Sequence, residues 1–272
     1  GMEGKNMNHN KKKILKVTAL FVFMFFLGWG AGSLQKQQMK KTVETVSVQN
    51  QADNWGLGFG AEGTQPTGNV TADELKKYNA WYVGDKNKKT IYLTFDCGYE
   101  NGNTEPILDA LKKHNAKATF FVVGRWAETH HESVLQIAMA GCELGSHSMA
   151  HSNMQKLTPE EQAEDLQACN RVLEQITGKK PGLFRAPYGA YSPELLSAAR
   201  GEGMLSIQWD IDSLDWKNLP PEQICNQIVE QIRPGSIVRF QSSALNTPTA
   251  LESLLEILQD EGYTFVTVSE LF

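Results

Sequence analysis

The feature that most constrains this chain is a regular alternation of short apolar segments with longer amphipathic segments after Lys89. The short segments have the composition of buried strands, and several long ones begin at Thr-Pro or Ser-Pro, a common helix start. Strands are predicted at Thr90–Asp96, Ala118–Val123, Cys142–His147, Gly182–Arg185, Met204–Asp210, Ser236–Gln241 and Tyr263–Val268. Helices are predicted at Thr104–Asn115, Glu128–Ala140, Pro159–Thr177, Ser192–Glu202, Pro221–Ile232 and Thr247–Glu261. This order predicts an α/β fold whose parallel strands are joined by right-handed crossovers.

The polar residues at the predicted strand ends help to distinguish an open doubly wound sheet from a small barrel. Asp96, His147, Arg185, Asp210 and Gln241 each end a different predicted strand. In a (β/α) barrel these ends converge on one mouth, where the chemistry lies, whereas an open sheet would hold the outermost of them far apart. The sequence therefore predicts a seven-stranded (β/α) barrel.

Composition excludes several classes of protein. The 272 residues are 41% hydrophobic and 21% charged, as in an ordinary globular chain. A net charge of -5 argues against a nucleic-acid partner, which would favour a basic excess. The four cysteines are scattered and lie mostly in apolar or helical segments, so we predict no disulfide.

The N-terminal part differs from the rest. Four lysines between residues 11 and 16 precede an uncharged run over residues 17–34, which is just long enough to span a hydrocarbon core of about 30 Å. Lysines before the run place the N-terminus in the cytoplasm. A cleaved signal peptide is the alternative, because small residues fill positions 30–33. Either way the remainder is exported, as a single-pass membrane protein or as a secreted one.

These features divide the chain into four parts. Residues 1–16 are expected to form a basic cytoplasmic tail, and residues 17–34 a transmembrane signal-anchor. Residues 35–70 are polar and then glycine-rich, typical of a linker or a packing arm. Residues 71–272 form the folded domain.

The predicted mouth carries residues suited to chemistry. His147 and His151 lie four positions apart, a spacing that on a helical turn lets both imidazoles bind one metal ion. Asp96 follows an alternating strand and precedes a glycine turn, and Arg185 leaves a strand beside Pro187. A turn-capping role for Asp96 and a rim salt bridge for Arg185 are the alternatives.

A second group lies in the segment WDIDSLDW. Asp210, Asp212 and Asp215 stand between Trp209 and Trp216. Three carboxylates between two indoles are poorly explained as a solvated surface, so a sugar-facing or proton-handling site is the better interpretation.

Five segments in this order resemble the motifs of the NodB-homology polysaccharide deacetylases, carbohydrate esterase family 4. They are TFDCGYENGNT, HSMAH, RAPYGAYS, WDIDSLDW and GSIVRFQ, and the match covers roughly residues 88–272. Within the family, GYENGNT and the earlier WGLGFGAEGTQPTGN are similar to sporulation-type, δ-lactam-forming peptidoglycan deacetylases. The resemblance implies an irregular, NodB-like seven-stranded barrel that holds a divalent metal, usually zinc.

The resemblance also implies roles for individual residues. His147 and His151 match the metal ligands, and Asp96 matches the base that takes a proton from metal-bound water. Arg185 matches the residue that orients this base, and the backbone N–H of Tyr188 would help to hold the oxyanion. Zinc lowers the pKa of bound water from 15.7 to about 7 and polarises the acetyl carbonyl.

Four further positions follow from the fourth and first motifs. Asp215 matches the carboxylate that tunes the fifth-motif histidine. Asp212 and Trp216, together with Tyr188, are expected to contact the substrate. Cys97 stands where the family usually has a second aspartate ligand, and a thiolate can bind zinc at about 2.3 Å.

The fifth motif departs from the family. Its histidine, which protonates the leaving amine, is replaced by Gln241, and an amide cannot donate a proton in this way at pH 7. Arg239 replaces an apolar residue of the pocket for the acetyl methyl. Two hypotheses follow. The first is a metal-dependent carbohydrate N-deacetylase that acts on peptidoglycan or a related N-acetylated glycan, and the second is an impaired member that binds glycan or a wall partner. A metal-free exported structural protein is a third alternative.

Overall fold

The computed structural model describes residues 57–58, 67–68 and 72–272. The predicted basic tail (1–16), the signal-anchor (17–34) and nearly all of the 35–70 segment lie outside the described residues. Among the residues that are described, no helix is both long enough and apolar enough to cross a membrane. Two short strands, β1 (Leu57–Gly58) and β2 (Thr67–Gly68), pair antiparallel.

The central element is a curved sheet of nine strands, whose pairings are all parallel. Its strands are β3 (Ala80–Trp81), β4 (Thr90–Cys97), β5 (Ala118–Val122), β6 (Glu143–Ser146), β7 (Leu183–Phe184), β8 (Leu205–Ile207), β9 (Ile211–Asp212), β10 (Ile237–Gln241) and β11 (Thr264–Phe265). The order is β3-β8-β7-β6-β5-β4-β10-β9, and β11 also pairs with β4.

All seven predicted strands are present, and the parallel α/β class is confirmed. The predicted seven-stranded barrel is confirmed only in part, because the ladder is an open half-barrel with two additional strands, β3 and β9. β8 and β9 are consecutive in the chain but lie toward opposite ends of the sheet order. The bend at 208–210 joins them, and the N–H of Asp210 donates to the carbonyl of Ile237 on β10. The sheet therefore curls around without completing a continuous ring.

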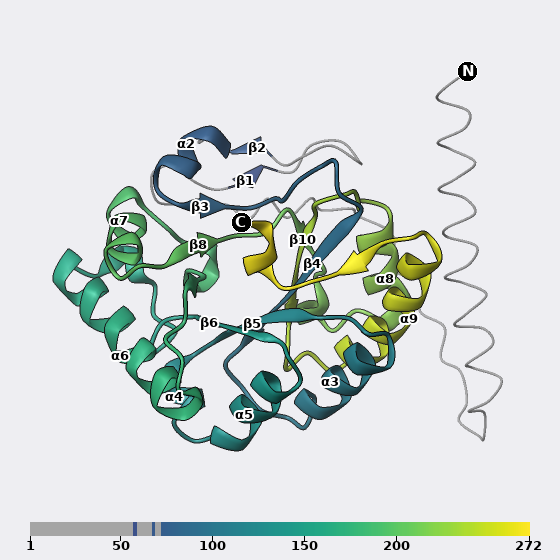
Figure 1. Cartoon of the computed structure of the whole chain (residues 1–272), viewed down its shortest axis with the longest axis horizontal. Helices are drawn as coiled ribbons and strands as arrows, with labels where there is room; N and C mark the ends of the chain where they lie inside the picture. Colours follow the sequence, from purple (N-terminus) through teal and green to yellow (C-terminus); the bar gives the residue numbers. More distant parts are fainter. Residues whose placement is uncertain (1–56, 59–66, 69–71) are drawn as a thin grey trace, which may run out of the picture.

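Helices lie in an arc around the outside of the strands (Figure 1). They are α2 (Ala72–Lys77), α3 (Thr104–Lys113), α4 (Gly124–Ala127), α5 (His131–Met139), α6 (Pro159–Thr177), α7 (Pro193–Gly201), α8 (Pro221–Val229) and α9 (Thr247–Asp260). The local sequence explains the bounds of α6: Thr158 and Glu161 form a capping box at its start, and Gly178 ends it in the left-handed conformation.

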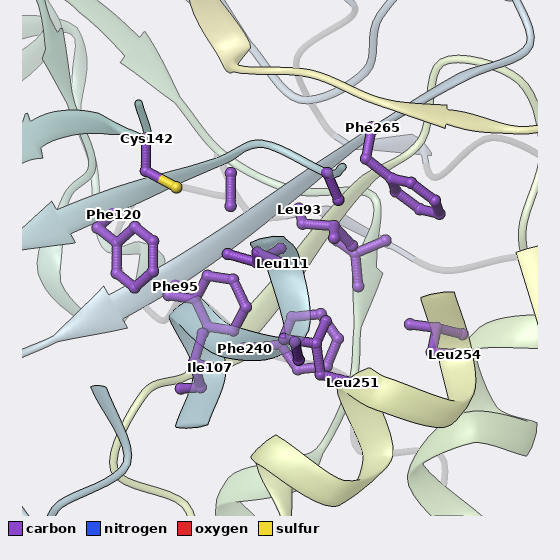
Figure 2. Close-up of a cluster of buried hydrophobic side chains, with 14 of the residues drawn as sticks. Leu93, Phe95, Ile107, Leu111, Phe120, Cys142, Phe240, Leu251, Leu254 and Phe265 are labelled. Carbon is purple, nitrogen blue, oxygen red and sulfur yellow. The ribbon is translucent and has the colours of Figure 1, made fainter. Parts of the chain in front are cut away.

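The main core lies between the sheet and the outer helices (Figure 2). Phe95 of β4 stacks between Phe120 of β5 and Phe240 of β10, with ring centroids 4.9 and 5.2 Å apart. Side chains alternate along a strand, so Asp96, Arg239 and Gln241 project from the opposite face to these phenyl rings. The same packing that buries the aromatic rings thus turns the polar residues toward the site.

Candidate functional site

Asp96 and Arg185 form the buried centre of the site. Nη1 of Arg185 donates to Oδ1 of Asp96 at 3.0 Å and to the hydroxyl of Thr94 at 2.7 Å. Its Nε and Nη2 donate to the carbonyls of Ile207 and Gln208. The arginine is fully buried and ties together the ends of three strands. It therefore holds Asp96 in one orientation, as the resemblance implies.

A second arginine, Arg239, takes the other oxygen of Asp96. Its Nε donates to Oδ2 of Asp96 at 2.6 Å, and its Nη1 donates to Asp212 at 3.0 Å. The guanidinium also lies 4.7 Å from the ring centroid of Trp209. Burial by itself would raise the pKa of Asp96, but the charge of Arg239, with its neighbours, holds that pKa well below its usual range. A carboxylate held in this way is a poor proton acceptor.

The two histidines meet beside Asp96. Their rings lie 4.9 Å apart, and Nε2 of His147 is 3.9 Å from Oδ2 of Asp96. Nδ1 of His147 lies 2.8 Å from the carbonyl of Arg185, which can only accept, so Nε2 presents a lone pair while the ring is neutral. Burial lowers the pKa of His147 to about 4. The predicted helical turn is wrong: the pair lies in the loop after β6, and His151 has a positive φ of 55°.

Asp215 supports the end of β10. Its carboxylate accepts the N–H of Gln241 at 2.9 Å and the hydroxyl of Thr247 at 2.6 Å. Burial raises the pKa of Asp215 to about 6. The residue therefore lies next to the fifth-motif position, as predicted, but it holds the backbone there.

The raised pKa of Asp215 predicts a pH dependence of stability. Asp215 of the folded chain keeps its proton up to about pH 6, whereas an ordinary aspartate, as in the unfolded chain, loses it near pH 3.8. The free energy of unfolding should fall by about 3 kcal/mol from this group between about pH 4 and 6, at 1.36 kcal/mol per pKa unit. Asp215→Asn should remove this fall in the free energy of unfolding, measured by urea titration at each pH. The control Asp109→Asn, at an exposed position, should leave the pH dependence unchanged. Parallel profiles for wild type and Asp215→Asn would contradict the assignment.

A cleft of about 630 Å³ opens over these groups. Its wall carries three exposed aromatic side chains, Tyr99, Tyr188 and Trp216, which are 70%, 58% and 43% exposed. The remaining lining residues are His151, Trp209, Asp212, Asn218, Arg239, Gln241, Ser243 and Ala244. Exposed rings above polar groups suit the apolar faces and hydroxyls of a sugar.

Most of the predicted site residues are brought together here. Tyr188, Asp212 and Trp216 line the cleft, and Tyr188 packs edge-on against His151 with centroids 4.7 Å apart. Tyr188 has a positive φ of 61°, a strained conformation for a tyrosine. Sequence reasoning missed Tyr99 as a cleft residue. Only its place inside the first motif, three residues after Asp96, could have indicated it.

Two other expected positions lie elsewhere. Cys97 belongs to the apolar core cluster with Phe95, and burial raises the pKa of its thiol to about 12. Asp210 is buried away from the cleft, paired with Arg233 at 2.7 Å and accepting the N–H of Ile237. All four cysteines are free and buried.

The residues present do not fit a divalent metal ion in this arrangement. Across the described part of the chain, no three His, Cys, Asp or Glu side chains converge as a metal-binding set. The Cys97 thiol is protonated in the core, both oxygens of Asp96 accept from guanidinium groups, and Arg239 adds a positive charge beside the histidines. Zinc ligation by His147 and His151 stays a prediction.

Comparisons with known proteins agree with the geometry. Residues 83–206 match the polysaccharide deacetylase family model. The peptidoglycan-N-acetylmuramic acid deacetylase PdaA of Bacillus subtilis is 31% identical over 234 residues, which cover 84% of this chain and 89% of PdaA. A peptidoglycan-N-acetylglucosamine deacetylase of Bacillus cereus is 32% identical over 202 residues, 73% of this chain and 74% of the relative.

Solved structures share the fold. That of PdaA, a family 4 carbohydrate esterase, aligns with a TM-score of 0.76 at 30% identity, covering 82% of this chain and 97% of PdaA. BA3943 of Bacillus anthracis, described as a pseudoenzyme of the same family, aligns with a TM-score of 0.69 at 34% identity, covering 71% and 68%. A mutant of BA3943 has restored enzymatic activity. This chain therefore belongs to the polysaccharide deacetylase family, carbohydrate esterase family 4, with peptidoglycan deacetylases among its relatives.

Proposed function

We propose that the cleft recognises N-acetylated glycan of the peptidoglycan type and that this chain hydrolyses it slowly or not at all. The observation that carries the proposal is the position of Arg239. Its guanidinium occupies the oxygen of Asp96 that a general base would use, in the pocket that the resemblance assigns to the acetyl group. Gln241, next to it in the cleft, has no acidic proton for a departing amine.

The glycan part of the proposal is supported by the cleft and by the relatives. Trp216 and Tyr188 present exposed rings at the wall, and Asp212 and Asn218 add polar atoms. Two relatives are named as deacetylases of N-acetylmuramic acid and N-acetylglucosamine in peptidoglycan. Carbohydrate recognition needs no proton transfer, so the loss of the fifth-motif histidine leaves it possible.

A binding experiment tests this proposal. The full-length chain should sediment with N-acetylated peptidoglycan and less with the same material after chemical N-deacetylation. Trp216→Ala should weaken binding about tenfold or more, a loss of about 1.4 kcal/mol or more. The matched control is Met139→Ala, because Met139 on α5 is 86% exposed and does not line this cleft. Equal binding by the two variants would overturn the proposed glycan site.

The second candidate is zinc-dependent deacetylation, the activity that the resemblance implies. It is favoured by His147, whose Nδ1 contact leaves Nε2 free beside Asp96, and by the Asp96–Arg185 pair. It requires Arg239 to leave Asp96 when substrate enters. Acetate released from peptidoglycan in zinc-containing buffer, at a rate that Asp96→Asn abolishes, would establish this candidate and remove the first.

The place of action is part of the proposal. The lysines before residues 17–34 and the uncharged run itself favour a membrane anchor with the domain outside the cytoplasm, or a secreted domain if the segment is cleaved. Peptidoglycan lies in that compartment. Protease accessibility of the domain in intact spheroplasts tests the topology, and protection from protease would contradict it.

A further inference from the structure

Arg239 is clamped between two carboxylates that belong to different strands. It lies on β10, which pairs with β4 on one side and β9 on the other. Its Nε donates a hydrogen bond to Asp96 of β4, and its Nη1 donates one to Asp212 of β9. The planar guanidinium also lies over the ring of Trp209. A guanidinium held by two carboxylates and an aromatic face occupies one position, since each partner fixes a different direction of the fork.

Within the ion pairs that hold Arg185 and Arg239, the charges are balanced. Asp96 and Asp212 carry two negative charges, and Arg185 and Arg239 carry two positive ones. Asp96 and Arg185 are buried, so an added dication would leave its charge uncompensated in a region of low dielectric constant. Without Arg239 the same group would carry one excess negative charge, which attracts a cation.

The two imidazoles lie close enough together to serve as two of the ligands of a metal site. Nε2 of His147 and Oδ2 of Asp96 are both acceptors, and they face each other at 3.9 Å. Two acceptors in this position need a cation or a donor nearby. Nε of Arg239 supplies the donor to the carboxylate oxygen, while the ring of His151 lies 4.9 Å from that of His147.

We propose that Arg239 takes the place of the divalent cation in this chain, so that the resting site binds no metal and removal of Arg239 opens a latent zinc site at His147 and His151. The inference follows from the ion pairs and stands apart from glycan recognition. The guanidinium of Arg239 differs from a metal ion in one important respect. It occupies an oxygen of Asp96 by hydrogen bonding and offers no coordination position for water or substrate.

The test is metal content after equilibrium dialysis of the full-length chain against zinc. Wild type should retain far less than about one equivalent. Arg239→Leu should retain about one, because the Asp96 oxygen that Arg239 occupies would join the two imidazoles as a third protein ligand beside water. Arg239→Lys is the matched control, since it keeps the positive charge and should stay metal-poor. Adding His147→Ala to Arg239→Leu should remove the gained zinc.

The zinc content of wild type compared with that of His147→Ala tests the proposal even if Arg239→Leu does not fold. About one zinc per wild-type chain, lost in His147→Ala, would overturn the proposal. A folded Arg239→Leu chain without zinc would overturn the latent site. Cobalt absorption bands provide a second readout, because tetrahedral Co²⁺ should be visible in Arg239→Leu and not in wild type. None of these results depends on whether the cleft binds glycan.

Discussion

Replacing Arg239 by leucine and Gln241 by histidine in one chain should raise acetate release from N-acetylated peptidoglycan by about 10² or more in zinc-containing buffer, the typical effect of a general acid. The leucine removes the guanidinium from Oδ2 of Asp96 and restores an apolar wall for the acetyl methyl. The histidine supplies a proton donor at a strand end that pairs in register with Asp96 and whose backbone is already held by Asp215.

Two controls separate this gain from background. Adding Asp96→Asn to the double variant should return acetate release to the wild-type level, because the amide keeps the shape and loses the basic oxygen. Gln241→His alone should give a smaller gain, since Arg239 still bonds Asp96. A double variant with wild-type circular dichroism and no gain would mean that the site has diverged beyond its fifth motif.

Replacing Arg185 by methionine should lower the free energy of unfolding by about 3 to 5 kcal/mol, the range for breaking a buried ion pair by removing one partner. Arg185 is fully buried, and its three nitrogens reach Thr94, Asp96, Ile207 and Gln208. Methionine fills part of the volume but leaves two carbonyls, the hydroxyl oxygen of Thr94 and one carboxylate oxygen without this donor. Urea unfolding followed by tryptophan fluorescence measures the loss.

Arg200→Met is the matched control for this prediction. Arg200 lies on the exposed side of α7, and its Nη1 donates to the carbonyl of Lys77 at 3.2 Å. Its replacement should change the free energy of unfolding by no more than about 0.5 kcal/mol, as is usual for surface substitutions. A loss of similar size in both variants would contradict a special role for Arg185.

The strand pattern explains how much of the site could be predicted from the sequence. The sequence predicts that Asp96 and Arg185 lie at one edge of the sheet, because each stands at the end of an apolar strand and the carboxyl ends of parallel strands share one edge. Tyr188, Asp212 and Trp216 were placed through the motifs that surround them. Cys97 lies in the core on the same face of β4 as Phe95, a placement that the alternation of the strand indicates and that its motif position alone does not.

The sequence by itself determined the order of strands and helices, the family motifs and the replacement of the fifth-motif histidine by Gln241. Alternation of side chains along IVRFQ also determined that Arg239 and Gln241 project from one face of the strand and Phe240 from the other. Only the tertiary structure decided which side chains the guanidinium of Arg239 contacts. β10 lies between β4 and β9, strands that are more than a hundred residues apart in the chain. Long-range pairing alone brings Asp96 and Asp212 to the two sides of one guanidinium, because no local preference of the chain encodes which strands become neighbours.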